Sequence, residues 1–158
     1  MSRELRPLAP GQSSLCEAVL RDIPEWFGIE ESLLNYVRDA ERLATWIVWA
    51  RGDDGGGEDA VGFMSLTHHY EHSAEIHCMA VKRAWHGRGV GRLLVRHAEA
   101  WCRGLGVEYL QVKTQGPSRP CPEYAGTTAF YERMGFRRLE EMKTLWGVVP
   151  ALVLVKRV

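Results

Sequence analysis

The sequence predicts an α/β fold in which a central, twisted, mixed sheet carries helices on both faces. Two observations predict this class. Segments of apolar and β-branched residues alternate along the chain with segments whose apolar residues recur every three or four positions. A glycine-rich turn at residues 86–91 also joins an apolar strand to an amphipathic helix. The expected order is β-α-α-β-β-β-α-β-α-β-β, and a length of 158 residues suits one domain over residues 1–158.

The first half of the chain predicts two helices and four strands. An apolar stripe on the second helix marks the face that packs inward. Proline and glycine in Ile23–Gly28 separate the two helices. The strands are rich in β-branched and aromatic residues. The expected ranges are helices 11–21 and 30–43, and strands 5–8, 45–50, 60–69 and 74–81.

The second half predicts two helices and three strands. In the helix over 90–103, Leu94, Ala98, Trp101 and Leu105 recur on one face and are expected to point inward. Arg92, Arg96, Glu99 and Arg103 recur on the other face, toward water. Gly135 is expected to cap the last helix in the left-handed conformation. The expected ranges are helices 90–103 and 124–134, and strands 107–113, 137–142 and 151–155.

Composition and charge predict a cytoplasmic enzyme. Lys and Arg balance Asp and Glu at 20 each, so the net charge of zero argues against nucleic acid or an anionic membrane as the main partner. No apolar run is long enough to span a bilayer, and the polar N-terminus does not resemble a signal peptide. The four cysteines lack Cys-x-x-Cys spacing, so we expect reduced and mostly buried thiols.

Three histidines close together, His68, His69 and His72, raise the question of a metal. Adjacent residues on a strand point to opposite faces, and no carboxylate or cysteine completes a ligand set there. We therefore expect no metal site.

The glycine-rich turn predicts an anion-binding site. Glycines at 87, 89 and 91 let backbone N–H groups approach a ligand, and the helix that follows begins with N–H donors and the positive end of its dipole. Such a site can hold a pyrophosphate. A P-loop is excluded because Arg92 and Leu93 follow Gly91 where Lys and Ser or Thr are needed. The spacing and the position halfway along the chain also do not match a dinucleotide fingerprint.

Two motifs follow each other along the chain. The first is His86-Gly-Arg-Gly-Val-Gly91, after the small and aliphatic pair Ala80-Val81, and the second is Phe130-Tyr-Glu-Arg-Met-Gly-Phe136. In this order they resemble the Arg/Gln-x-x-Gly-x-Gly/Ala and Phe-Tyr-x-x-x-Gly-Phe motifs of the GNAT N-acetyltransferase superfamily. The chain departs from the family at His86, usually Arg or Gln, and at Tyr124, often Asn. The resemblance extends over about residues 45–136 and implies acetyl-CoA as co-substrate, with a homodimer as a common state.

The resemblance also implies which residues hold the co-substrate. Backbone N–H groups over residues 88–92 would bind the pyrophosphate, and the strand edge at residues 79–81 would pair with the pantetheine amides. The Val81 N–H would stabilise the oxyanion of acyl transfer. The expected contact residues are Met79, Ala80, Val81, His86, Gly87, Arg88, Gly89, Val90, Gly91, Arg92, Tyr124 and Tyr131.

Catalytic roles fall on Glu75 and Tyr131. A lysine-like amine is mostly protonated at neutral pH, so a base is needed, and some GNAT members have a catalytic glutamate at the position of Glu75. His77, on the same strand face, or a water molecule is the alternative base. The alternative for Glu75 is an exposed strand-end carboxylate with no role. Tyr131 matches the tyrosine that protonates the departing thiolate in many members of the family.

The sequence therefore predicts an acetyl-CoA-dependent N-acetyltransferase. Its acceptor would be a primary amine on a small molecule, a peptide N-terminus or a lysine. The acidic residues Glu25, Glu30 and Glu31, and the loop 146–150, are candidates for the acceptor wall. Two other interpretations stay open: a non-catalytic acyl-CoA-binding or sensing module, and a purely structural domain.

Overall fold

A computed structural model describes residues 2–158 and confirms the mixed α/β class. Its seven strands hydrogen-bond in the order β1-β2-β3-β4-β5-β7-β6. Strands β4 and β5 are parallel, whereas β1–β2, β2–β3, β5–β7 and β6–β7 are antiparallel. The elements are β1 Arg3–Pro7, α1 Ser13–Arg21, α2 Glu30–Arg42, β2 Ala44–Arg51, β3 Glu58–Tyr70, β4 Ser73–Val81, a 3₁₀ turn η1 Arg83–Trp85, α3 Val90–Gly104, β5 Tyr109–Gln115, α4 Pro122–Arg133, β6 Arg137–Trp146 and β7 Val149–Arg157.

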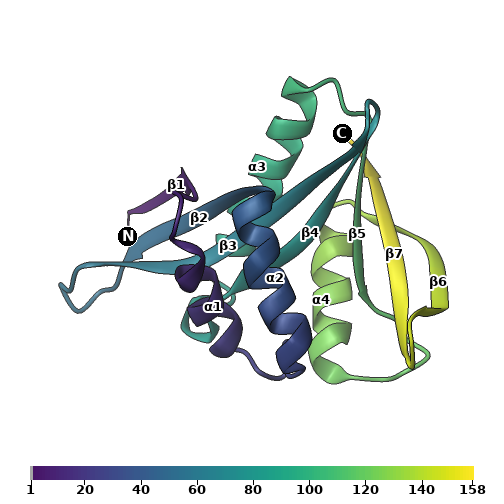
Figure 1. Cartoon of the computed structure of the whole chain (residues 1–158), viewed down its shortest axis with the longest axis horizontal. Coiled ribbons are helices and arrows are strands. Elements are labelled where there is room, and N and C mark those ends of the chain that lie inside the picture. The colour runs from purple at the N-terminus through teal and green to yellow at the C-terminus, as the bar shows by residue number, and fades with distance from the viewer. Residues whose placement is uncertain (1) are drawn as a thin grey trace. The chain divides into compact units, whose positions relative to one another are not determined.

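The chain forms two compact units, and β3, β4 and α3 each contribute to both. The first unit comprises the chain up to Thr67 together with Cys78–Arg96. Here β1 pairs with β2 and β2 pairs with β3, and α1 and α2 lie side by side (Figure 1). The helices bury an apolar face against the strands, and the buried set is Cys16, Val19, Leu20, Ile23, Leu33, Ala40, Ile47, Ala60, Phe63, Cys78 and Ala80.

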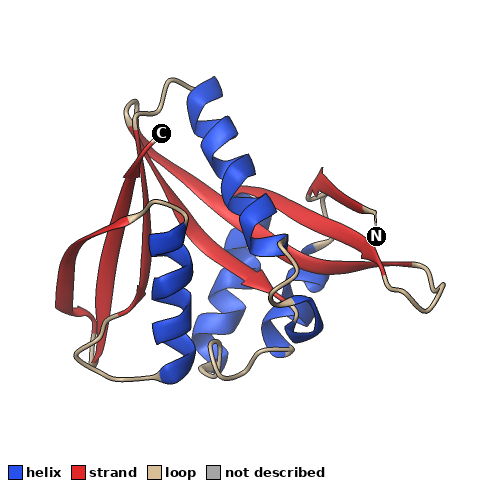
Figure 2. Cartoon of the chain, turned by 180° about the vertical axis from the view of Figure 1, so that it is seen from behind, coloured by secondary structure: helices blue, strands red, loops and turns tan. Residues whose placement is uncertain are grey.

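The second unit comprises His68–His77 and His97–Val158. The start of β4 pairs with β5 from Ser73↔Tyr109 to Ile76↔Val112, and β5 pairs in turn with β7. The hairpin of β6 and β7 turns at Gly147, whose φ of 69° is left-handed (Figure 2). Strand β6 is mostly exposed, as expected for a strand at the edge of a sheet.

Two expectations for α3 are wrong. Leu105 was expected to point inward but is exposed, because the helix ends at Gly104. Glu99 was expected to face water but is buried, because Lys156 of β7 donates to its carboxylate. The strand expected from Val107 begins at Tyr109 instead, since the Val107 N–H turns back to the Cys102 carbonyl at 2.9 Å.

The four cysteines are free thiols, and Cys16, Cys78 and Cys102 are buried as predicted. Cys121 is half-buried. Across residues 2–158, no helix combines the length and the apolar character that crossing a membrane requires.

Candidate active site

The predicted glycine turn forms between η1 and α3. Gly87 and Gly89 adopt φ angles of 71° and 83°, a region that side chains other than glycine rarely enter. The Leu93 N–H donates to the Gly89 carbonyl at 3.0 Å, and this bond opens the helix. The N–H groups of the first helical turn, Val90 to Arg92, therefore precede the first i→i−4 bond of the helix. This arrangement concentrates N–H donors and the positive dipole end at one place.

Side chains hold this turn in place from both ends. Nε2 of His86 lies 2.7 Å from the Val81 carbonyl oxygen, and the His86 ring meets the Trp26 ring edge-on. The Arg88 guanidinium lies over the Trp85 ring, 5.1 Å from its centroid. These contacts restrain the turn, and such restraint lowers the entropic cost of binding a ligand.

Arg3 of β1 also reaches the turn, which the sequence did not indicate. Its Nη1 donates to the Arg88 carbonyl. A Cβ placed on Gly89 would lie 3.1 Å from the same nitrogen. A second positive charge, remote in sequence, thus lies beside the N–H groups of the turn. The pairing of β1 with β2 brings Arg3 to the turn.

At the end of β4, backbone N–H groups point alternately to the two edges of the strand. The Lys82 N–H donates to the Val61 carbonyl of β3 at 2.8 Å. Successive N–H groups of a strand point to opposite edges, so the Val81 N–H points away from β3. Gly62 permits this close packing, because a Cβ there would lie 3.1 Å from both the Ala80 carbonyl oxygen and Val90.

Glu75 lies in a polar cluster and is not the exposed carboxylate that was one of the two interpretations. Its side chain is 8% exposed. Lys113 Nζ donates to Oε1 and Oε2 at 3.1 and 3.0 Å, and Gln111 Nε2 donates to Oε1 at 3.1 Å. Nε2 of His69 lies 2.7 Å from Oε1. Burial raises the pKa of Glu75, but the bonds from His69, Lys113 and Gln111 outweigh it and hold the pKa below its usual value.

Tyr131 lies on α4 and is buried. Its ring contacts Phe130 and Phe136 edge-on, with centroids 5.2 and 5.4 Å apart. The Phe136 N–H donates to the Tyr131 carbonyl at 3.0 Å, which closes the helix end at the left-handed Gly135. Phe136 is buried, and Phe130 is half-buried.

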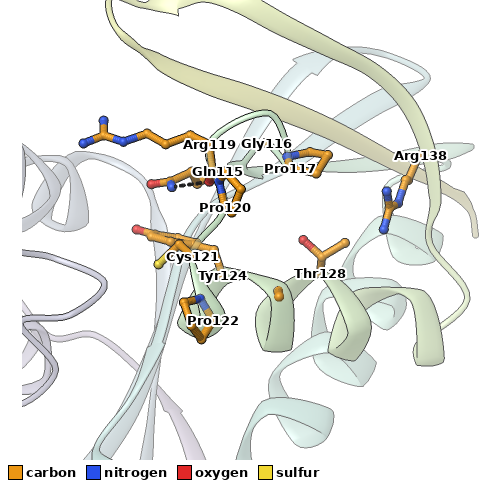
Figure 3. A pocket seen from close by; sticks show the side chains of 11 residues that line it. Gln115, Gly116, Pro117, Arg119, Pro120, Cys121, Pro122, Tyr124, Thr128 and Arg138 are labelled. Atoms are coloured by element: carbon orange, nitrogen blue, oxygen red, sulfur yellow. Dashed lines mark hydrogen bonds between the residues drawn. The ribbon is translucent and has the colours of Figure 1, made fainter.

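A cavity of about 380 Å³ lies at the start of α4 (Figure 3). It is lined by the β5–α4 loop, by α4 and by Arg138 of β6. Tyr124, one of the residues expected to contact the co-substrate, forms part of its wall. Gln115 Nε2 donates to the Arg119 carbonyl at 3.0 Å and holds the loop.

The histidines expected not to form a metal site have separate partners. His68 meets Trp101, His69 meets Glu75, and His72 stacks on Tyr70. Within residues 2–158, no group of three or more His, Cys, Asp or Glu side chains is arranged to hold a metal ion.

Two of the acids expected at the acceptor wall are already paired. Glu25 forms an ion pair with Arg83, and Glu30 forms one with Arg21 at 2.7 Å. These pairs leave less negative charge for a cationic amine than the sequence indicated.

The predicted residues fall into two groups. Met79 to Arg92 lie in the first unit, and Glu75, Tyr124 and Tyr131 lie in the second. Sequence reasoning missed Arg3, Gly62, and the partners of Glu75. Of these, only Gly62 could have been found from the sequence, since a glycine inside a strand often marks a place where another backbone comes close.

One class of proteins binds phosphate through backbone amides. Its members combine a strand, a glycine turn with left-handed φ angles, and a helix whose first N–H groups have no partner within the helix. A family model described as "Acetyltransferase (GNAT) family" matches residues 13–136, so the chain belongs to the GNAT acetyltransferase family. The co-substrate of this family is acetyl-CoA.

Three known proteins show how far the similarity extends. The N-alpha-acetyltransferase RimI of Mycobacterium tuberculosis is 37% identical over 65 residues, which are 41% of this chain and 35% of that protein. A GNAT-family structure from Desulfovibrio desulfuricans matches with a TM-score of 0.82 and 18% identity over 99% of both chains. A GNAT family acetyltransferase from Elizabethkingia anophelis with acetyl-CoA bound matches with a TM-score of 0.73 and 15% identity, over 99% of this chain and 98% of that one. The two structures support the fold.

Proposed function

We propose that this chain is an acetyl-CoA-dependent N-acetyltransferase that acts on a primary amine. The observation that carries the proposal is the left-handed glycine turn after Val81. Two left-handed glycines there precede the N–H groups of the first turn of α3. Glu75 favours an enzyme over a protein that only binds acetyl-CoA. This buried carboxylate lies in a polar cluster that lowers its pKa and keeps it ionised.

The residues of the turn suit the diphosphate of coenzyme A. The N–H groups over residues 88–92 supply donors, and Arg3, Arg88 and Arg92 supply positive charge. Because His86 Nε2 is bonded to the Val81 carbonyl, we assign His86 to holding the turn. Met79, Ala80 and Val81 would offer backbone groups to the pantetheine amides.

Acetyl-CoA supplies an activated acetyl thioester. The Val81 N–H would stabilise the negative charge that develops on the carbonyl oxygen, and such a donor contributes about 3 kcal/mol to lowering a barrier. Glu75 would take a proton from the acceptor ammonium, directly or through a water molecule. The Tyr131 hydroxyl would give a proton to the departing sulfur.

The name of one relative indicates which class of acceptor to test first. RimI is named an N-alpha-acetyltransferase, so a peptide α-amino group is the first acceptor to test. Lysine side chains and small amines are the alternatives. The shared scaffold does not decide between them, because the acceptor is bound by variable loops.

The turn is tested by Gly89→Ala, with Gly106→Ala as the matched control. Both glycines have left-handed φ angles, 83° and 74°, but Gly106 lies beyond the far end of α3. Each substitution should cost about 1–3 kcal/mol of stability through backbone strain. Only Gly89→Ala should weaken acetyl-CoA binding, by 10-fold or more in calorimetry.

The same proteins decide between enzyme and sensor. Release of free coenzyme A is followed with a tetrapeptide bearing a free α-amino group, an Nα-acetylated peptide with one lysine, and a polyamine. Turnover of any of these supports the proposal. Tight binding of acetyl-CoA without turnover supports a sensing module, and equal binding by the two glycine variants contradicts the assignment of the turn.

A further inference from the structure

The cavity at the start of α4 is a candidate for a second ligand site. All of its lining residues belong to the second unit, whereas the glycine turn belongs to the first. Its volume of about 380 Å³ lies in the range of pockets that hold small organic molecules. Tyr131, which the proposed transfer uses, does not line it. The cavity therefore has no role in the function proposed above.

Thr128 directs a buried hydroxyl into this cavity. The residue is 7% exposed, and Figure 3 shows its oxygen on the side of α4 that faces the β5–α4 loop. A threonine in a helix often donates to the carbonyl four residues earlier, as the neighbouring Thr127 does to Glu123 at 3.2 Å. Among the described residues, 2–158, none is hydrogen-bonded to the Thr128 hydroxyl. Because a buried polar group without a partner is costly, this hydroxyl indicates a ligand.

Arg138 of β6 brings positive charge to the cavity. Its Nη2 donates to Glu132 Oε1 at 3.3 Å, a long contact between two exposed side chains. A guanidinium has five N–H donors, so this contact leaves others for a ligand. The other arginine of the lining, Arg119, points its guanidinium away from the cavity (Figure 3). In the part of the chain that the structure describes, no carboxylate lines the cavity.

The remaining walls are mostly apolar. Pro117, Pro120 and Pro122 have no polar side-chain atom, and Tyr124 and Ala125 line the cavity with them. A strongly hydrated ion such as phosphate would lose water against these walls without gaining partners there. A ligand with an apolar part would instead bury that part against them. The walls therefore favour an organic anion over an inorganic one.

We propose that this cavity binds a small carboxylate with an apolar body. The Arg138 guanidinium and the Thr128 hydroxyl both donate to the carboxylate, and the positive end of the α4 dipole favours its charge. The prolines and the Tyr124 ring contact the apolar body. Binding there uses no residue of the glycine turn, so it does not depend on acetyl-CoA.

Titration of ¹⁵N-labelled protein with benzoate tests the site. Benzoate joins a carboxylate to an apolar ring, benzamide has nearly the same shape without the charge, and inorganic phosphate has charge without an apolar body. Benzoate should bind saturably and shift the amide resonances of residues 115–128 and 138, and the other two should bind about 10-fold more weakly or not at all. Equal binding of benzamide or phosphate contradicts the proposal. A failure of benzoate to bind means that the cavity holds only water, and it also overturns the proposal.

Two matched pairs of variants locate the binding. Thr128→Val keeps the shape of the side chain and should weaken benzoate binding by about 10-fold. Thr127→Val should not weaken it, because Thr127 does not line the cavity. Arg138→Gln should also weaken binding by about 10-fold, whereas Arg137→Gln, at the adjacent exposed position, should match the wild type. Equal affinities within either pair would refute the assignment of that side chain.

The protein without ligand gives an independent check. Because the Thr128 hydroxyl has no partner to lose, Thr128→Val should not lower the Tm measured by circular dichroism. A clear decrease would show that the hydroxyl is bonded within the protein, and would contradict the proposal.

Competition with acetyl-CoA separates this site from the proposed function. Tyr124 lines the cavity and is also an expected co-substrate contact, so displacement of benzoate by acetyl-CoA would make the cavity part of the co-substrate site and refute the proposal. Simultaneous binding of both supports it. If acetyl-CoA does not bind at all, the proposed function fails, and the benzoate titration still decides what the cavity binds.

Discussion

Replacing Lys156 by Met should destabilise the protein strongly. Lys156 Nζ donates to the Glu99 carboxylate and, at 2.7 Å, to the Met134 carbonyl. The Glu99 side chain is 3% exposed and that of Lys156 is 19% exposed. The substitution removes the cation that neutralises a buried carboxylate and a donor to the end of α4.

The expected loss of stability follows from the burial of the Lys156–Glu99 pair. Breaking a buried ion pair from one side costs about 3–5 kcal/mol, and we take the lower end because Lys156 is partly exposed. We therefore expect the free energy of unfolding to fall by about 3 kcal/mol. For a domain of this size, that corresponds to a decrease in Tm of about 6–12 °C.

Urea denaturation and thermal melts followed by circular dichroism measure the effect. Lys82→Met is the matched control, since Lys82 pairs at 2.8 Å with Asp59, which is 60% exposed. Such a pair contributes about 1 kcal/mol or less. The double variant Glu99→Gln/Lys156→Met should recover part of the loss because the buried charge is gone. If Lys156→Met lowers the free energy of unfolding by no more than Lys82→Met does, burial does not strengthen the Lys156–Glu99 pair as we expect.

Two further predictions concern the proposed catalytic residues. Tyr131→Phe should lower kcat by about 100-fold with little change in acetyl-CoA affinity, because it removes one proton donor and keeps the packed ring. Steady-state rates measure kcat, and calorimetry measures the affinity. An unchanged kcat would remove Tyr131 from the mechanism. Because the folded protein holds the pKa of Glu75 below its usual value, the stability that this group provides should be present at neutral pH and be lost on acidification through the lowered pKa. Urea titrations from pH 3 to 7 should show a smaller acid-dependent loss in Glu75→Gln, and an equal loss would contradict the stabilising cluster.

The sequence predicted the features that depend on neighbours in the chain. Gly87 and Gly89 were expected to be needed for their backbone, and both have left-handed φ angles. Gly135 was expected to cap α4 and does so. Such conformations depend on a few consecutive residues, so composition and spacing are enough to predict them.

Features that depend on contacts between distant segments could not be predicted. Glu99 lies on the polar side of a helical projection, but its partner Lys156 comes from β7. The surroundings of Glu75 likewise combine β3, β4 and β5, and a single sequence does not give the register of their pairing. Arg3 reaches the glycine turn for the same reason.

The burial of the cysteines has a practical consequence for reagents that react with sulfhydryl groups. Burial raises the pKa of the Cys16 thiol to about 12 and that of Cys102 to about 11, and it raises the pKa of Cys78 well above its usual value. Since thiolates are the reactive species, these three side chains should resist alkylation in the native protein. A chromogenic disulfide reagent should then modify the protein first at Cys121, and the other three should react only as the protein unfolds.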